Sequence, residues 1–426
     1  ACEKRPVAGS AARVPSSGEL AGIGVVATGH QTLPGKGSTQ TAVPGLAFKR
    51  GGAGPGGAGQ SRASWTQGIL DPMPTKPLPP SDLAEILELA RTSFEGLRGA
   101  RVFLTGGTGF FGHWLLESLL YANRELHLEL QCTVLTRDAA AFRAKSPHIT
   151  ENTRVTLLEG DIRSFTFPTE THTHIVHAAT DSGGQQAQRP AYELAESILE
   201  GTRRVLQFAQ VTGAKRLLYT STGAVYGRST TLPHTPETYL GAPDPLQLAS
   251  SYDEAKRMAE HLCIAYAHAS SLEPVIARCF AFVGPHLPLD AHFAIGNFLG
   301  AAIRGEQIHI KGDGTPRRSW LYMSDLAAWL WTLLVQAEPN RAYNVGSGEA
   351  FTIAEAAQLA ANTLRPDAQG GSSLPIQIDG VANPAAPLNS YVPDIHRVRG
   401  ELGLQVTVPL AEGLKRTASW HSRQAG

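Results

Sequence analysis

The chain lacks an excess of either charge, and it lacks a long hydrophobic run. Its 426 residues include 37 Lys and Arg and 37 Asp and Glu, so its formal net charge at pH 7 is zero. A balanced charge gives no electrostatic reason to bind nucleic acid or an anionic membrane surface. The longest clean apolar run, Leu326 to Val335, is about half as long as the ~20 residues that a membrane-spanning helix needs. We therefore expect neither nucleic acid nor a membrane as a partner.

Cysteine is also scarce. The four cysteines, Cys2, Cys132, Cys263 and Cys279, are neither spaced as metal ligands are nor arranged in pairs. This pattern predicts no metal site. In a chain of this length such cysteines indicate a reducing compartment, and we expect the protein to be cytoplasmic.

Apolar residues at helix or strand spacing are rare near the N-terminus. Of the 44 glycines, 15 fall within the first 68 residues, and residues 51–59 are nearly all Gly, Ala and Pro. Such a segment cannot bury enough apolar surface to offset the entropy lost on ordering. We predict that residues 1–75 form a disordered extension. Order should begin with a helix near residue 81, where Asp82 and Glu85 form a capping-box pattern.

Strand-like and helix-like segments alternate beyond residue 100. The predicted strands are 101–105, 131–136, 155–159, 173–177, 216–220 and 275–281, and the helices between them include 110–121, 194–212 and 252–267. Strands this uniformly apolar are typical of a parallel sheet buried between two helix layers. The alternation changes after residue 285 to a mixed, loop-rich pattern. We therefore predict an α/β fold with a doubly wound parallel sheet in residues 76–285, interleaved with a smaller α/β domain in residues 286–426.

A glycine-rich turn follows the first predicted strand. Gly106, Gly109 and Gly112 stand between that strand and the next helix. The first two allow a tight turn and a close approach of the backbone to a pyrophosphate, and the third lets the helix pack on the sheet. The motif predicts a Rossmann-type, dinucleotide-binding domain. The alternative is a purely structural turn.

A tyrosine, a lysine and a hydroxyl form the second candidate group. Tyr252 and Lys256 are four residues apart on a predicted helix and so share a face. A phenol with a pKa near 10 is a poor base at neutral pH, but a neighbouring ammonium favours its phenolate form. Thr222 follows a predicted strand, at the sheet edge where doubly wound folds bind ligands. It is placed to share a substrate proton with Tyr252, although turn chemistry and a chance helical pair are alternatives.

In their order and spacing, these features closely resemble the extended short-chain dehydrogenase/reductase family, and within it the nucleotide-sugar epimerases and dehydratases. The resemblance covers roughly residues 100–405. It implies a nucleotide-sugar substrate, a catalytic set of Thr222, Tyr252 and Lys256, and substrate contacts from Thr222 and Arg318. The cofactor-binding residues that it implies are Gly106, Gly109, Phe110, Phe111, Gly112, Arg137, Asp161, Ile162, Ala178, Ala179, Thr220, Tyr252, Lys256 and Cys279.

Two positions depart from the family's pattern. Its dehydratases carry Asp-Glu directly after the catalytic Thr, and its decarboxylating members also use a Glu there, whereas this chain has Gly223 and Ala224. Since neither side chain can accept or donate a proton, we expect hydride transfer at the sugar C4 by a 4-epimerase or a 4-keto reductase. The alternatives are a 4,6-dehydratase with a displaced acid and base, and a non-catalytic NAD(P)-binding scaffold.

The cofactor type depends on the end of the second predicted strand. Arg137 can receive the 2′-phosphate of NADP, whereas Asp138 suits the free ribose of NAD. A third interpretation is that Arg137 only stacks on the adenine. The sequence favours NADP by a small margin over NAD.

The resemblance also implies a homodimer. Relatives pair through two helices that correspond here to residues 194–212 and 252–267. Both carry more apolar residues than one buried stripe requires, and a second stripe needs a partner. The residues in question are Leu199, Val205, Phe208, Leu262 and Ile264.

Overall fold

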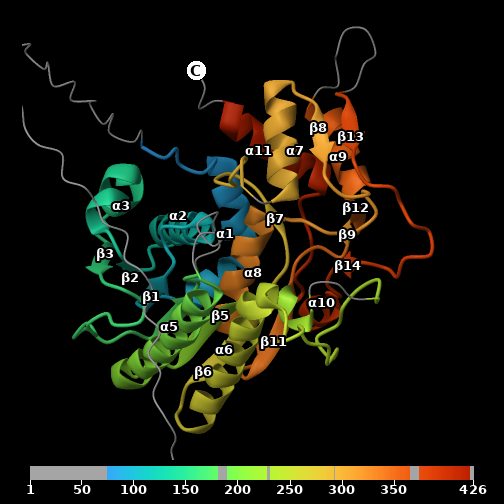
Figure 1. Cartoon of the computed structure of the whole chain (residues 1–426). Helices are drawn as coiled ribbons and strands as arrows, with labels where there is room; N and C mark the ends of the chain where they lie inside the picture. The colour runs from blue at the N-terminus through green and yellow to red at the C-terminus, as the bar shows by residue number, and fades with distance from the viewer. Residues whose placement is uncertain (1–73, 181–189, 228–230, 292, 365–373, 423–426) are drawn as a thin grey trace, which may run out of the picture. The chain divides into compact units, whose positions relative to one another are not determined.

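Figure 1 shows a computed structural model of the chain, which describes residues 74–180, 190–227, 231–291, 293–364 and 374–422. The predicted extension, residues 1–75, therefore lies outside the described residues except for its last two. The helices are α1 (Pro80–Gly96), α2 (Phe110–Glu125), α3 (Ala139–Lys145), α4 (Pro147–Thr150), α5 (Ala191–Thr212), η2 (Gly223–Tyr226), η3 (Leu248–Ser250), α6 (Ser251–His268), α7 (Ala294–Arg304), α8 (Met323–Gln336), α9 (Ile353–Leu364), α10 (His396–Leu402) and α11 (Leu410–Ser422). The strands are β1 (Arg101–Thr105), β2 (Gln131–Thr136), β3 (Val155–Glu159), β4 (His174–His177), β5 (Arg216–Thr222), β6 (Glu273–Cys279), β7 (Phe282–Val283), β8 (Ile308–Ile310), β9 (Arg317–Arg318), β10 (Leu321–Tyr322), β11 (Arg341–Val345), β12 (Phe351–Thr352), β13 (Ile376–Ile378) and β14 (Ser390–Tyr391).

A seven-stranded sheet in the order β11-β6-β5-β4-β1-β2-β3 forms the centre of the fold. Every neighbouring pair of its strands is parallel. The chain adds strands outward from β1 to β3, then crosses over and adds β4, β5 and β6 on the other side. Ligands of doubly wound sheets bind at the carboxyl ends of the strands where this order reverses, here between β1 and β4. The predicted α/β fold with a Rossmann-type, doubly wound parallel sheet is confirmed.

Helices cover both faces of this sheet because successive strand residues point to opposite sides. Val102 and Leu104 belong to one buried cluster, which includes residues of α1, α2 and α8, whereas Phe103 between them belongs to the other. That second cluster is closed by α5 and α6, which pack against each other. Figure 1 shows α5 (green) and α6 (yellow) side by side in the lower part of the view.

The chain after residue 285 contributes to the central sheet and also forms smaller sheets of its own. Strand β11 pairs with β6 at the edge of the large sheet, and α8 packs on its face. The smaller sheets are β12-β9-β14, β10-β7 and β13-β8. The division at residues 285 and 286 stays a prediction.

The predicted capping box at the start of α1 is wrong. Helix α1 begins at Pro80 with Pro79 as its N-cap, and no side chain caps it. Asp82 is fully buried instead, accepting hydrogen bonds from the Tyr322 hydroxyl at 2.7 Å and from Arg416 at 3.0 Å. Its carboxylate ties α1 to β10 and α11, a tertiary role that a local sequence pattern does not reveal.

Buried histidines should make the fold acid-sensitive. Burial lowers the pKa of His113 to about 4 and that of His177 to about 3. The unfolded state therefore binds more protons than the folded state below pH ~6.5, so stability falls as the pH drops from about 6.5 toward 4. Thermal melts should show the midpoint falling across that window. Replacing His113 by Gln should flatten the profile between about pH 6.5 and 4. A midpoint independent of pH would contradict this.

Candidate active site

The glycine turn closes tightly over the carboxyl end of β4. Gly106 has φ +77°, and a β-carbon on it would lie 2.5 Å from the Ala178 carbonyl oxygen. A β-carbon on Gly112 would lie 2.3 Å from the Gly107 carbonyl oxygen, so α2 can approach the turn only because residue 112 has no side chain. Gly109 is different, because its nearest neighbour would be 3.5 Å away. The turn thus requires glycine at 106 and 112 and stays open at 109.

The start of α2 carries no competing side chain. Gly109 is its N-cap, and no side chain caps the helix. Unpaired N–H groups at a helix N-terminus attract a phosphate. Of the two phenylalanines that follow Gly109, Phe111 packs edge-on against Phe282 with ring centroids 5.1 Å apart, and Phe110 is partly buried beside it. The arrangement fits a pyrophosphate at this helix end.

Lys256 lies at the carboxyl end of β5. Its ammonium donates a hydrogen bond to the Thr220 carbonyl oxygen at 2.8 Å and lies 4.8 Å from the centre of the Tyr219 ring. Only 2% of Lys256 is exposed, and burial lowers its pKa to about 8. Tyr252 lies one turn earlier on α6 and is partly exposed. A cation that stays charged near neutral pH is thus held next to the strand end that also carries Thr222.

Thr222 is the last residue of β5, and its hydroxyl has two neighbours. It accepts a hydrogen bond from the Ala224 amide at 3.2 Å and thereby caps the N-terminus of the short helix η2. It also lies 3.2 Å from the hydroxyl of Tyr391 on β14. No sequence pattern points to Tyr391, because β14 has only two residues and no periodic pattern.

An aromatic side chain fills the space beside Gly223. A β-carbon at this position would lie 2.6 Å from Phe280 Cζ. Phe280 packs in turn on Tyr391, with ring centroids 4.7 Å apart. No side chain, and therefore no acid, fits at position 223 unless Phe280 moves. Its neighbour Ala224 is buried and has no titratable group.

A buried ion pair lies next to the strand residues that precede Thr222. Arg278 donates to both carboxylate oxygens of Glu260, at 2.6 Å from Nη2 and 3.0 Å from Nε. Glu260 also accepts a hydrogen bond from the Ser221 hydroxyl, next to Thr222. The guanidinium lies 4.7 Å from the centre of the Tyr226 ring. These contacts join β5, α6 and β6 immediately behind Thr222.

Two of the predicted cofactor-binding residues, Arg137 and Asp161, lie together. Arg163 binds the Asp161 carboxylate at 2.8 Å, and Arg163 and Arg137 both lower the pKa of that carboxyl, Arg163 the more strongly. Asp138 instead caps helix α3, because its carboxylate accepts a hydrogen bond from the Ala141 amide at 2.8 Å. Arg137 and Asp161 are thus close to each other, whereas one oxygen of Asp138 is already engaged.

The remaining predicted cofactor residues lie along the same sheet edge. Ala178 and Ala179 follow β4, and the Ala179 amide donates to the Thr105 hydroxyl at 3.1 Å. Ile162 packs in the core against Gly201 on α5. Cys279 ends β6 beside β5, where burial raises the pKa of its thiol to about 12 and so favours the protonated form near neutral pH.

Arg318 is the predicted substrate-binding arginine. Its guanidinium donates to the Asn389 side chain at 3.1 Å and lies 5.9 Å from the centre of the Tyr391 ring. Strand pairing places Arg318 directly opposite Tyr391. The structure thus connects Arg318 to Thr222 through Tyr391.

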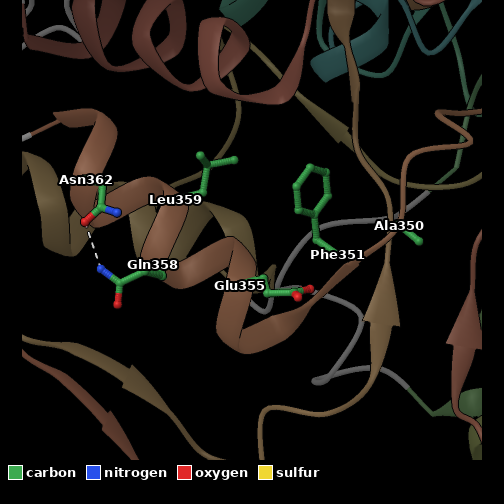
Figure 2. A pocket seen from close by; sticks show the side chains of 6 residues that line it. All are labelled: Ala350, Phe351, Glu355, Gln358, Leu359 and Asn362. Carbon is green, nitrogen blue, oxygen red and sulfur yellow. Dashed lines mark hydrogen bonds between the residues drawn. The ribbon is translucent and has the colours of Figure 1, made fainter.

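A surface hollow lies elsewhere, along α9. Figure 2 shows the six side chains that line it, Ala350, Phe351, Glu355, Gln358, Leu359 and Asn362. The single charged group among them is the Glu355 carboxylate, which would repel a diphosphate. None of these residues belongs to the predicted site, so this hollow is separate from the candidate active site.

Comparison with known proteins places this chain in a family. Residues 102–346 match the NAD dependent epimerase/dehydratase family. The chain is 30% identical to UDP-glucuronic acid decarboxylase 6 of Arabidopsis thaliana over 314 residues, which cover 74% of this chain and 86% of that protein. None of the helices in the described residues is long and apolar enough to cross a bilayer.

Solved structures share the fold. The UDP-glucose 4-epimerase of Thermus thermophilus in complex with NAD superposes with a TM-score of 0.61 at 24% identity, covering 76% of this chain and 100% of that one. The dTDP-glucose 4,6-dehydratase of Streptomyces venezuelae, with NAD bound, gives 0.63 at 24% identity, covering 76% and 98%. With the family match and the decarboxylase likeness, they lead to one conclusion: the chain belongs to the NAD dependent epimerase/dehydratase family.

Proposed function

We propose that this protein oxidises or reduces C4 of a nucleotide-bound sugar with a nicotinamide cofactor, as a 4-epimerase or a 4-keto reductase. The proposal is supported by membership of the family and by the names of the three relatives described above, each of which names a nucleotide sugar. It is also supported by the position of Thr222 at the carboxyl end of β5. The Lys256 ammonium donates a hydrogen bond to the Thr220 carbonyl oxygen of the same strand.

The residues present fit a dinucleotide. Gly106 and Gly112 occupy positions where a β-carbon would meet backbone, and the open N-terminus of α2 offers its N–H groups to a pyrophosphate. Gly106 and Gly109, with the N-terminus of α2, would hold the pyrophosphate, while Gly112 lets α2 pack on the turn. Arg137 and Asp161 would hold the adenosine, and Lys256 the nicotinamide ribose. When bound, the nicotinamide supplies the acceptor or donor of a hydride.

The proton chemistry is assigned to the chain's own side chains. Tyr252 would remove the proton from the sugar 4-hydroxyl as general base, and Lys256 would stabilise negative charge on the Tyr252 oxygen. Thr222 would donate a hydrogen bond to the same sugar oxygen. If the 4-keto sugar then rotates in the site so that its other face meets the nicotinamide, the hydride would return to that face and the product would be the 4-epimer.

The observation that favours epimerisation or reduction is the contact between Phe280 and Gly223. Loss of water across C5 and C6 needs an acid and a base near those carbons. The 2.6 Å approach to Phe280 Cζ leaves no room for a carboxylate at position 223, and Ala224 provides none. With a nicotinamide as the hydride acceptor, oxidation at C4 would need only Thr222, Tyr252 and Lys256 from the chain's own side chains.

Decarboxylation is a second candidate. The curated relative at 30% identity is a UDP-glucuronic acid decarboxylase. Oxidising C4 of a uronic acid creates a β-keto acid. Its C5–C6 bond can break with release of carbon dioxide, the electron pair entering the C4 carbonyl as an enolate, and C5 then takes up a proton. The absence of a carboxylate at positions 223 and 224, which hold Gly and Ala, counts against this outcome.

Proton NMR of the products would test the proposal. The protein should be incubated with UDP-glucose, UDP-glucuronic acid, dTDP-glucose and a 4-keto nucleotide sugar, each with NAD and with NADPH. We expect a 4-epimer, or reduction of the 4-keto sugar, and neither with the Tyr252→Phe variant. A 4-keto-6-deoxy product would indicate a dehydratase, and a pentose with released carbon dioxide a decarboxylase. Cofactor binding without any product would indicate a scaffold.

Cofactor preference can be tested through Arg137, for which we propose contact with a 2′-phosphate. Such a contact is charge-assisted, so Arg137→Ala should weaken NADP binding by about ten- to a hundredfold while NAD binding barely changes. The matched variant is Asp138→Asn rather than Asp138→Ala, since Asn keeps the cap on α3 and removes only the charge. Equal loss of both cofactors in Arg137→Ala would show adenine stacking, and loss of NAD in Asp138→Asn would make Asp138 the ribose ligand.

We also propose a homodimer that pairs through α5 and α6. Of the apolar residues expected at the interface, Val205 and Phe208 are fully buried in the chain's own core, which excludes them. Val211 on α5 and Met258 on α6 are 70% and 47% exposed and could meet a partner. Light scattering at low micromolar concentration should give the dimer mass, and a charged residue at Met258 should shift it toward the monomer. A monomer mass for the unaltered protein would contradict the proposal.

A further inference from the structure

Tyr391 lies at the centre of the site although no motif pointed to it. Its hydroxyl is 3.2 Å from Thr222 Oγ1, and its ring lies on Phe280 and next to the Arg318 guanidinium. Within the described residues, Thr222 is the hydrogen-bond partner of the Tyr391 hydroxyl. The phenol therefore joins the predicted substrate-binding arginine to the predicted catalytic threonine.

The direction of the hydrogen bond between Thr222 and Tyr391 decides whether Thr222 can donate to a substrate. A threonine hydroxyl has one proton to donate and two lone pairs to accept. The Ala224 amide at 3.2 Å uses one lone pair of Thr222. If Thr222 donates to Tyr391, it has no proton left for a substrate oxygen. If Tyr391 donates to Thr222, both lone pairs are used and the threonine proton is available to the substrate.

The surroundings of Tyr391 favour donation by the phenol. Burial raises the pKa of Tyr391 to about 12, so its hydroxyl keeps its proton at neutral pH. The negative charge of the nearby Asp253 acts in the same direction. A buried phenol proton without an acceptor is costly, and Thr222 is the acceptor at hand.

We propose that Tyr391 is a positioning residue that donates to Thr222 and thereby makes the Thr222 hydroxyl a hydrogen-bond donor to the 4-oxygen of the sugar. This inference rests on the proposed function. The Thr222 hydroxyl then polarises the developing C4 carbonyl, while Tyr252 exchanges the proton. Phe280 keeps the Tyr391 ring in place and occupies the space of the absent acid.

A double-mutant cycle tests this, because coupled residues give non-additive effects. Tyr391→Phe should lower kcat by roughly five- to tenfold with KM changed by less than about twofold, since a single hydrogen bond that matters in the transition state is lost. In the Thr222→Ala background the same change should lower kcat by less than about twofold. The matched control is Tyr343→Phe, another buried phenol whose hydroxyl bonds to Glu401 at 2.8 Å. It should leave kcat unchanged. Thermal melts and cofactor titration establish that each variant is folded.

Three results would overturn the inference. Unchanged kcat in Tyr391→Phe would show that Thr222 needs no partner. Equal losses in both backgrounds would show that Tyr391 acts independently of Thr222. If the unaltered protein turns over no nucleotide sugar, the proposed function fails and this inference fails with it, which distinguishes that case from the other two.

Discussion

Replacing Tyr252 by Phe is expected to lower turnover by about 10²- to 10⁴-fold while folding and cofactor binding stay intact. The change removes only the phenol oxygen, which carries the proton relay, and general acid–base catalysis contributes a factor of this size. Lys256 keeps its hydrogen bond to the Thr220 carbonyl, so the strand end is not disturbed. Steady-state rates and cofactor titration would measure the two effects separately.

The control for this variant is Tyr266→Phe, on the same helix but more than three turns away from Tyr252. Its turnover should equal that of the unaltered protein. Turnover of Tyr252→Phe within threefold of the unaltered protein would remove Tyr252 from the mechanism.

Glu260→Ala should lower the free energy of unfolding by about 3–5 kcal/mol. Glu260 is 6% exposed and binds Arg278 through two carboxylate oxygens. Removing one partner of a buried ion pair leaves the other charge without compensation, which costs this much in other proteins. Ser221 would also lose its acceptor directly beside Thr222. Urea unfolding would measure the loss.

An exposed ion pair provides the matched control. Arg304 and Glu306 lie 2.8 Å apart, and both side chains are more than half exposed. Glu306→Ala should change the free energy of unfolding by less than about 1 kcal/mol. Replacing both Glu260 and Arg278 by apolar residues of similar size should recover much of the loss, since no buried charge then remains. Equal small losses for the two single variants would contradict the assigned role of the buried pair.

The central sheet could be predicted from the sequence because its signals are local. The bounds of β1, β2 and β3 agree with the apolar runs that predicted them. The glycine turn is local in part: Gly112 is required by contact with Gly107 within the turn, whereas Gly106 is also required by contact with Ala178, which β4 brings close. The order of the strands then brings the predicted site residues to one edge of the sheet.

The contacts that shape the substrate side could not be predicted in this way. Thr222 and Tyr391 are 169 positions apart and meet only because the two-residue strand β14 pairs with β9. Phe280 lies in a predicted strand end, but its approach to Gly223 depends on how that strand lies beside β5. Asp82 was expected to cap its own helix and instead bonds to Tyr322 across the fold. In each case the partner is set by tertiary packing, which leaves no periodic trace.

The central claim, hydride transfer at C4, is tested most directly with a nucleotide sugar that carries deuterium at C4. With a 4-hydroxy substrate found in the product survey, the deuterium should leave C4, appear in the reduced cofactor or return to C4 of the product, and slow single turnover by a primary isotope effect. A 4-keto substrate has no hydrogen at C4, so in that case the deuterium is placed at the hydride position of the reduced nicotinamide and should appear at C4 of the product. Tyr252→Phe should abolish this transfer. Deuterium that stays at C4 throughout turnover, or that is lost to solvent, would contradict the account.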